Sequence, residues 1–337
     1  MNVYFTVDTE SSMAGAWSHP ERRPLTADRH IFCRIGEEDY GIGLITRVLS
    51  EHGFRATHFV ETLATLVNGE DDSKRVFDYL LEHNQDVQLH VHPTYRDYSQ
   101  ALRAGAAGQT GEPSAAADFL GTFPEARQME LLEEAGRLYR QFAGRPPVAF
   151  RAGCFAASRA TLRCLSRLGI RLDSSFNPCY RTWSFAGENL EPNRVCQVEG
   201  VWEIPITVAR TPLLEGHGGL KFADPCALSV RELQVMLEAG AKAGQRHFVI
   251  VFHCFAAVKA KDYTYSQIKP DRIVIRRLEK LMEYLEKRAD LFRVSTFGEL
   301  AREISLLEAG EAPLSNLGLA AAAVRKSVQG MNRNYWF

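Results

Sequence analysis

Short apolar runs alternate with amphipathic stretches along most of the chain. The runs are rich in β-branched and aromatic residues and are bounded by polar or turn residues, which is typical of strands. The stretches between them repeat apolar residues every three or four positions, which is typical of helices with one buried face. The predicted strands cover residues 2–8, 56–61, 86–93, 147–153, 170–175, 201–207, 247–255 and the start of 291–304, and the predicted helices cover 43–53, 73–84, 125–144, 158–169, 229–244, 272–288 and the end of 291–304.

This alternation predicts parallel βαβ units in an α/β fold. No linker-like break interrupts residues 1–305, so we expect one domain there and a C-terminal tail at 306–337. The number of units suits a (β/α) barrel, complete or lacking one unit. The alternative is a doubly wound open sheet, which predicts a glycine-rich phosphate-binding turn after the first strand, and "DTESSMAGAW" contains none. Two irregular segments, near 11–40 and 94–124, are predicted loop insertions.

Composition narrows the class of protein. Hydrophobic residues make up 45% and charged residues 24% of the chain, and the net charge is −1. This balance argues against a dedicated nucleic-acid-binding protein, because phosphate binding needs a basic surplus. No apolar stretch of about eighteen residues predicts a transmembrane helix. The start "MNVYFTVDTE" lacks the features of a secretion signal, and the seven scattered cysteines do not resemble a disulfide framework, so we expect a cytoplasmic protein.

Polar side chains stand at the ends of several predicted strands. In a (β/α) barrel the carboxyl ends of the strands meet at one rim, where the catalytic residues of such folds are found. His90 and His92 in "LHVHP" are two positions apart, so in a strand both rings point to the same face. The residues predicted to meet at this rim are Asp8, Glu10, His90, His92, Arg151, Asp173 and His253.

These residue types suit one kind of chemistry. A divalent metal ion held by two imidazoles and one carboxylate keeps a position open for water and lowers the pKa of that water. A free carboxylate nearby can accept a proton from the water, and a histidine across the site can protonate a leaving amine. An arginine can orient the carboxylate, and a further acid can fix the tautomer of the histidine. The set therefore indicates a metal-assisted amide or ester hydrolase.

The order of these motifs resembles the polysaccharide deacetylase superfamily (carbohydrate esterase family 4, NodB homology) over roughly residues 1–300. "FTVDTE", "LHVHP", "FRAG", "LDSS" and "VFHCF" resemble its five motifs in order. The resemblance implies a distorted (β/α) barrel, usually of seven strands, and metal-dependent removal of acyl groups from sugars. It implies that Asp8 is the catalytic base and that Arg151 pairs with it. It further implies that His253 is the catalytic acid and that Asp173 tunes this histidine.

Two departures from the family pattern concern the metal ligands. The first motif of the family usually has adjacent aspartates, of which the second binds the metal, but here Thr9 follows Asp8. Part of the superfamily has an acid-x-acid pattern, which makes Glu10 the third ligand beside His90 and His92. The alternative is that Asp8 itself binds the metal and the base lies elsewhere. The two histidines are also two rather than four positions apart, and "VDTE" with "HxHP" looks most like a branch found among lipopolysaccharide-biosynthesis proteins.

The resulting hypothesis is a hydrolase that removes an acetyl or formyl group from an amino sugar or glycan precursor in surface-polysaccharide or lipopolysaccharide biosynthesis. The expected cofactor is a divalent metal ion, zinc first, with nickel and cobalt as alternatives. Two other functions stay open: an amidase or deformylase acting on a small non-sugar amide, and a non-catalytic carbohydrate-binding descendant. No nucleic-acid partner is expected, and the C-terminal tail offers a route to oligomerisation. Glu203 in "VWEIPIT" is left open between a buried structural pair and a substrate contact.

Overall fold

A parallel sheet forms the centre of the molecule. The computed structural model describes residues 1–109, 111, 113–212, 219–310 and 314–334. Nine strands pair in the order β12-β1-β4-β5-β6-β7-β9-β8, with β15 beside the first half of β1. Only β8 is antiparallel to its neighbour in this sheet of the described residues. The strands are β1 (Asn2–Thr9), β4 (Thr57–Glu61), β5 (Asp86–Val91), β6 (Ala149–Ala152), β7 (Leu172–Asp173), β8 (Cys196–Val198), β9 (Val201–Glu203), β12 (His247–His253) and β15 (Arg293–Ser295).

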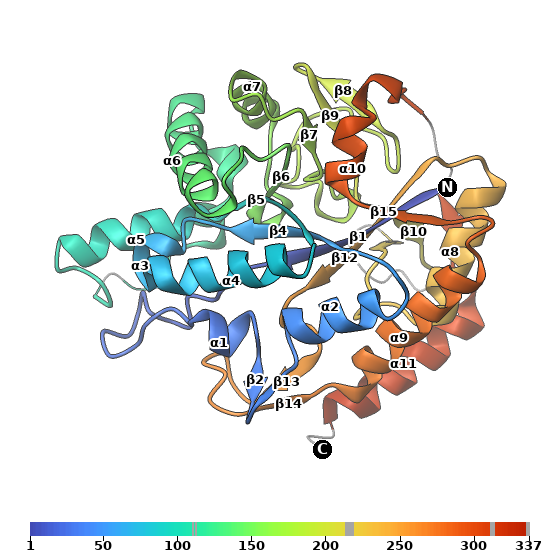
Figure 1. Cartoon of the computed structure of the whole chain (residues 1–337), viewed down its shortest axis with the longest axis horizontal. Helices are drawn as coiled ribbons and strands as arrows, with labels where there is room; N and C mark the ends of the chain where they lie inside the picture. The colour runs from blue at the N-terminus through green and yellow to red at the C-terminus, as the bar shows by residue number, and fades with distance from the viewer. Residues whose placement is uncertain (110, 112, 213–218, 311–313, 335–337) are drawn as a thin grey trace.

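Helices surround this sheet, as Figure 1 shows. Three of them begin with a capping box, in which Ser158, Ser229 or Thr296 exchanges hydrogen bonds with the residue three positions on. The helices are α1 (Ala27–His30), α2 (Ile42–Ser50), α3 (Thr65–Asn68), α4 (Glu70–Glu82), α5 (Pro93–Arg103), α6 (Glu125–Ala143), α7 (Arg159–Arg167), α8 (Val230–Lys242), α9 (Arg272–Lys287), α10 (Phe297–Arg302) and α11 (Leu319–Asn334). Short strands form smaller sheets: β2 (Arg34–Ile35) with β3 (Glu38–Asp39), β13 (Val258–Ala260) with β14 (Ile268–Pro270), and β10 (Val208–Arg210) with β11 (Leu220–Phe222) and β16 (Ser315–Asn316).

The predicted α/β alternation is confirmed, and each predicted strand and helix overlaps an observed one. The predicted count of seven strands in a barrel is not confirmed. The sheet is a curled half-barrel, because no ladder joins its outer strands β12 and β8 within the described residues. Across the open side the backbone N–H of Val249 donates to the hydroxyl of Thr207, which follows β9, at 2.9 Å. Strands as short as β8 carry too few residues for a pattern, which explains the difference in count.

The segment predicted as a loop insertion at 94–124 is largely regular. It holds most of α5 and two 3₁₀ turns, Ala115–Asp118 and Leu120–Thr122, while residues 110 and 112 lie outside the described residues. β5 ends at Val91, and Pro93 starts α5, where its missing N–H costs no hydrogen bond. The buried side chains of Tyr95 and Tyr98 hold this helix on the domain. Polar and alanine-rich composition hid this order from the sequence.

The C-terminal tail packs on its own chain. The guanidinium of Arg325 in α11 donates to both carboxylate oxygens of Glu232 in α8 at 3.0 and 3.1 Å, and both side chains are buried. Gln329 donates to the carbonyls of Cys226 and Ala227. Residues 311–313 and 335–337 of the predicted tail lie outside the described residues. The route to oligomerisation through the tail stays a prediction. None of the helices among the described residues is both long and apolar enough to cross a membrane.

Candidate metal centre and active site

The register of the parallel sheet brings the predicted residues together at the carboxyl ends of its strands. Asp8 in β1 lies level with His253 in the adjacent strand β12. His90 in β5 lies level with Arg151 in the adjacent strand β6. The strands β12, β1, β4, β5 and β6 are consecutive in the sheet, so these side chains face one short edge. This edge is where (β/α) folds place their chemistry.

Glu10, His90 and His92 form a compact set of metal donors. One carboxylate oxygen of Glu10 lies 3.0 Å from Nε2 of His90 and 2.7 Å from Nε2 of His92. The ligand atoms of the three residues all lie within 4.8 Å of one another. Two imidazole nitrogens and one carboxylate around a common point are the donor set of catalytic zinc sites, so the residues fit a divalent ion.

The charged groups around Glu10, His90 and His92 favour a positive charge at this site. Burial alone would raise the pKa of Glu10, but the charge of His92 and hydrogen bonds from both imidazoles hold it well below its usual value. Burial alone would lower the pKa of His92, but the carboxylates of Asp118 and Glu10 raise it well above its usual value. The two acids around His92 therefore favour a positive charge in this pocket. A metal ion bound there would supply this charge in place of a proton.

Each imidazole is oriented by a second hydrogen bond. Nδ1 of His90 donates to the backbone carbonyl of Arg151 at 2.8 Å, which leaves Nε2 to face Glu10. Nδ1 of His92 lies 2.5 Å from a carboxylate oxygen of Asp118. The other oxygen of Asp118 accepts from the backbone N–H of Thr94 at the start of α5. Such partners fix the tautomer and the ring direction of metal-binding histidines.

The predicted pair of Asp8 and Arg151 is present and buried. Nη1 of Arg151 donates to Asp8 at 2.6 Å, and both side chains are almost completely shielded from solvent. Arg151 also donates to the hydroxyl of Thr6 and to the carbonyl and hydroxyl of Ser174. Its guanidinium carbon lies 4.3 Å from the ring centre of Phe59. These contacts fix the position of a buried charge that would otherwise be costly.

His253 stands opposite this pair and is the more accessible partner. Its Nε2 lies 3.9 Å from a carboxylate oxygen of Asp8, and 31% of its side chain is exposed. Asp224 is a further acid near this ring. Burial raises the pKa of Asp224, and the charge of His253 opposes that rise. Sequence reasoning missed Asp224, because it follows a three-residue strand that no pattern marks.

Asp173 contacts its own neighbours in the chain and in the sheet, and its predicted role beside His253 stays a prediction. Its carboxylate accepts from the hydroxyl of Ser175 at 2.6 Å, and that hydroxyl accepts from the backbone N–H of Ala152 at 2.9 Å. Burial raises the pKa of Asp173. Burial and the charge of Asp173 raise the pKa of Glu203 well above its usual value. Within the described residues no ion pair joins Asp173 to His253, so no contact supports the predicted tuning.

Sequence reasoning also missed three residues that support the metal donors. Asp118 lies in the segment predicted as an insertion. His30, in the loop at 11–40, donates through Nδ1 to the backbone carbonyl of Glu10 at 2.8 Å. Glu61 at the end of β4 accepts from the backbone N–H groups of His92 and Leu63. Only Glu61 had a signal in the sequence, because it ends a predicted strand next to the one carrying the histidines.

The turn after Arg151 is conformationally unusual. Cys154 and Phe155 have positive φ angles of 53° and 58°, which non-glycine residues rarely adopt. A Cβ added to Gly153 would lie 2.5 Å from Nδ1 of His92, so the backbone of this turn packs directly on the imidazole. Strained backbone held against a cluster of acids and histidines is characteristic of functional sites.

The comparisons with known proteins agree on the fold. No protein-family model and no curated protein matches the sequence. A solved structure assigned as a polysaccharide deacetylase from Mycobacterium smegmatis shares 16% identity over 94% of each chain, with a TM-score of 0.52. One assigned as a glycoside hydrolase/deacetylase from Parabacteroides distasonis shares 11% identity over 91% of this chain and 71% of that chain, with a TM-score of 0.59. An allantoinase shares 13% identity over 91% of each chain, with a TM-score of 0.51. The chain therefore has the fold of structures assigned as polysaccharide deacetylases.

Proposed function

We propose that this chain is a metal-dependent hydrolase that removes an N-acyl group, acetyl or formyl, from an amino sugar. The observation that carries the proposal is the convergence of Glu10, His90 and His92 beside the buried Asp8–Arg151 pair and His253. Zinc is the proposed ion, with nickel and cobalt as alternatives. A precursor of surface polysaccharide or lipopolysaccharide is the proposed substrate, and the cytoplasm is the proposed compartment.

Glu10, His90 and His92 would hold the ion, and Asp8 would remain free of it. When bound, the ion polarises the acyl carbonyl and makes water acidic enough to react near neutral pH. Asp8 accepts a proton from the attacking water. Arg151 orients Asp8 through the 2.6 Å hydrogen bond and supplies a fixed opposite charge beside it. The proposal thus separates the metal ligand Glu10 from the base Asp8.

His253 donates a proton to the nitrogen of the leaving amine. Its partial exposure supports this role, because a proton donor must reach the substrate. The charge of His253 acts on the buried Asp224, and Asp224 is proposed to orient this ring. Asp173 is instead a positioning residue, which acts through Ser175 on the backbone of Ala152 next to Arg151. The backbone N–H near Cys154 is the proposed donor to the oxyanion.

A second candidate function is an amidase acting on a small non-sugar amide. The fold likeness to an allantoinase favours it. Trp183, whose indole N–H donates to the carbonyl of Cys154, stacks with Phe119 and Tyr180, with ring centres 5.2 and 5.1 Å away. These two contacts occupy ring surface of Trp183 that a sugar would need for stacking. This geometry removes one argument for a sugar substrate, so substrate class needs a direct test.

The test is an assay of the metal-loaded protein against two substrate groups. One group contains N-acetyl and N-formyl amino sugars and short glycans, and the other contains formamides and cyclic amides such as allantoin. Release of acetate or formate from the sugars, lost in Asp8→Asn, supports the proposed deacetylase. Turnover of the small amides alone supports the second candidate. Sugar binding without turnover by a fully metal-loaded protein supports the carbohydrate-binding alternative and contradicts both enzymes.

A further inference from the structure

A second group of candidate metal donors lies on the Nδ1 side of the His92 ring. It consists of His92, Asp118 and Cys154, whose ligand atoms all lie within 4.8 Å of one another. We propose that this group binds a second, thiophilic divalent ion such as Zn²⁺ or Cd²⁺, with His92 bridging the two sites through its two ring nitrogens. The proposal rests on the proposed function only because His92 belongs to both groups.

The two nitrogens of His92 face different partners. Nε2 lies 2.7 Å from Glu10, on the side of the proposed catalytic ion. Nδ1 lies 2.5 Å from Asp118, on the side of Cys154. An ion at Nδ1 would therefore not compete for the Nε2 position. An imidazole that has lost both N–H protons can bind one metal ion through each ring nitrogen.

Only small side-chain movements are needed to form the second site. Nitrogen, oxygen and sulfur ligands at ~2.0 to 2.3 Å from a tetrahedral zinc ion stand ~3.3 to 3.7 Å from one another. The present contact between Nδ1 of His92 and Asp118 is shorter than this at 2.5 Å, while no donor pair exceeds 4.8 Å. The contact must open and the thiol must approach. The Gly153 backbone, packed on the imidazole, keeps the Cys154 turn next to the ring during this change.

The donor set suits a thiophilic ion, and its thiol is accessible to solvent. Cys154 is exposed, in contrast to buried cysteines such as Cys33 and Cys254. A thiolate selects zinc or cadmium over magnesium or calcium, which prefer oxygen ligands. Binding releases the thiol proton of Cys154 and the Nδ1 proton of His92 to solvent. It also takes Asp118 away from its hydrogen bond with His92, so excess ion should inhibit the hydrolase.

Cadmium titration tests the second site, because a cadmium–thiolate bond adds an ultraviolet charge-transfer band. The whole chain is titrated with Cd²⁺, and bound ion is counted by equilibrium dialysis. The wild type should bind two ions and show the band. Cys154→Ser should bind one ion and lose the band. Cys196→Ser, which removes a half-buried cysteine in β8, is the matched control and should behave as the wild type.

Glu10→Gln separates this inference from the proposed function. It should weaken the first ion at least ten-fold and keep the charge-transfer band. A wild type that binds one ion without the band overturns the second site and leaves the proposed function standing. A band that persists in Cys154→Ser also overturns it. A band that is present while Glu10→Gln changes no affinity supports the second site and contradicts the assignment of Glu10.

Discussion

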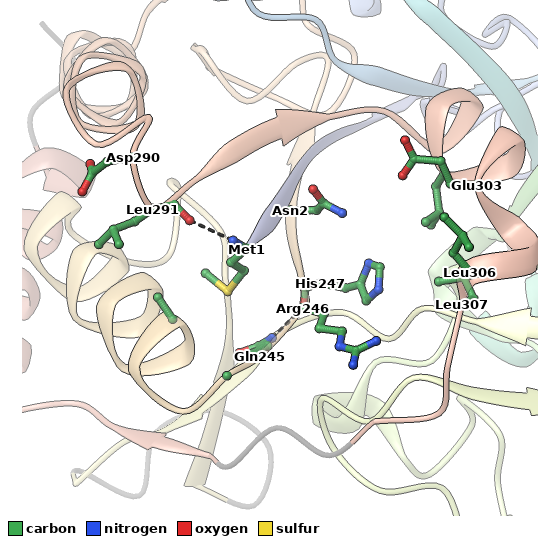
Figure 2. Close-up of a pocket in the computed structure, with 13 residues that line it drawn as sticks. Met1, Asn2, Gln245, Arg246, His247, Asp290, Leu291, Glu303, Leu306 and Leu307 are labelled. Atoms are coloured by element: carbon green, nitrogen blue, oxygen red, sulfur yellow. Dashed lines mark hydrogen bonds between the residues drawn. The ribbon is translucent and has the colours of Figure 1, made fainter.

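The two edges of the same parallel sheet carry similar residues but arrange them differently. At the amino edge a cavity of about 580 Å³ is lined by residues that include Arg246, His247 and Glu303 (Figure 2). There His247 and Arg246 have separate partners: His247 bonds the hydroxyl of Tyr4, and Arg246 pairs with Glu308. At the carboxyl edge, by contrast, the donor atoms of Glu10, His90 and His92 share one point. Convergence of donors, rather than the volume of a cavity, marks the candidate site.

Two histidines show the electrostatic side of this contrast. Burial, helped by the charge of Arg246, lowers the pKa of His247 to about 4, so this ring is neutral at pH 7. His92 is buried too, but Asp118 and Glu10 raise its pKa well above the usual value. Burial at the amino edge therefore disfavours a charged imidazole, whereas two acids at the carboxyl edge favour one. A metal ion should choose the carboxyl edge because Glu10 there supplies a carboxylate beside two imidazoles.

The largest effect should come from removing the imidazoles at the carboxyl edge. His90→Ala with His92→Ala leaves only Glu10 of the proposed donors, so bound metal should fall below detection and turnover by at least about a thousand-fold. Metal analysis and an acyl-release assay measure both. His247→Ala is the matched control at the amino edge and should keep metal and activity. Loss of metal in His247→Ala, or stoichiometric metal in the double variant, would contradict a metal site at the carboxyl edge.

Asp8→Asn distinguishes the base from a ligand. Because Asp8 is the proposed base, activity should fall by a factor of about 10² to 10⁴. Because Glu10 is the proposed ligand, one metal ion per chain should remain. Glu10→Gln should do the opposite, because it removes a proposed ligand and should lose affinity for the metal ion. If Asp8→Asn loses its metal while Glu10→Gln retains it, Asp8 is the third ligand and the base lies elsewhere.

The buried acids Asp173 and Glu203 predict a dependence of stability on pH. The pKa of Glu203 is raised in the folded state, so from about pH 4.5 upward the folded chain keeps a proton that the unfolded chain has released. The free energy of unfolding should therefore fall as pH rises, by ~1.4 kcal/mol per pH unit for this one proton, until the pH reaches the raised pKa.

Glu203→Gln should remove that contribution, because its amide N–H replaces the retained proton at every pH. The measurement is urea unfolding at several pH values, with the exposed Glu191→Gln as the control for lost charge. Glu61, whose pKa burial raises to about 8, adds a similar slope to every variant, so the difference between variants is the informative quantity. Equal slopes in Glu203→Gln and wild type would mean that the pair retains no proton.

The smallest effect should come from the amino edge. Arg246 and Glu308 are both well exposed, and an exposed ion pair contributes less than about 1 kcal/mol. Arg246→Ala should therefore change the free energy of unfolding by less than this and leave turnover unchanged. Chemical unfolding and the acyl-release assay check both values. A loss of activity in this variant would indicate that the cavity at the amino edge takes part in function.

Most of the fold and the main donors could be predicted from the sequence, because both depend on local pattern. Long strands such as β1 and β5 are continuous apolar runs, and the rule that parallel strands end at one edge then joins Glu10 to His90 and His92. The Asp8–Arg151 contact is present as expected. The strand count was not obtained, because three-residue strands such as β8 carry no periodicity.

The supporting residues could not be predicted, because their positions depend on tertiary packing. Asp118 sits 26 residues beyond His92, in a segment whose composition predicts a loop. Asp173 accepts from the hydroxyl of Ser175, two positions along the chain, and lies level with the buried Glu203 of the adjacent strand β9. Neither the contact of Asp118 nor the level position of Glu203 follows from spacing along the chain.

The location of bound metal tests the central claim most directly. Crystals of the whole chain loaded with one equivalent of zinc would be measured at the zinc absorption edge. The account predicts one anomalous peak at ~2.0 to 2.2 Å from Nε2 of His90, Nε2 of His92 and a carboxylate oxygen of Glu10. A peak bound by Asp8 in place of Glu10, or a peak beside His247 at the amino edge, would contradict it.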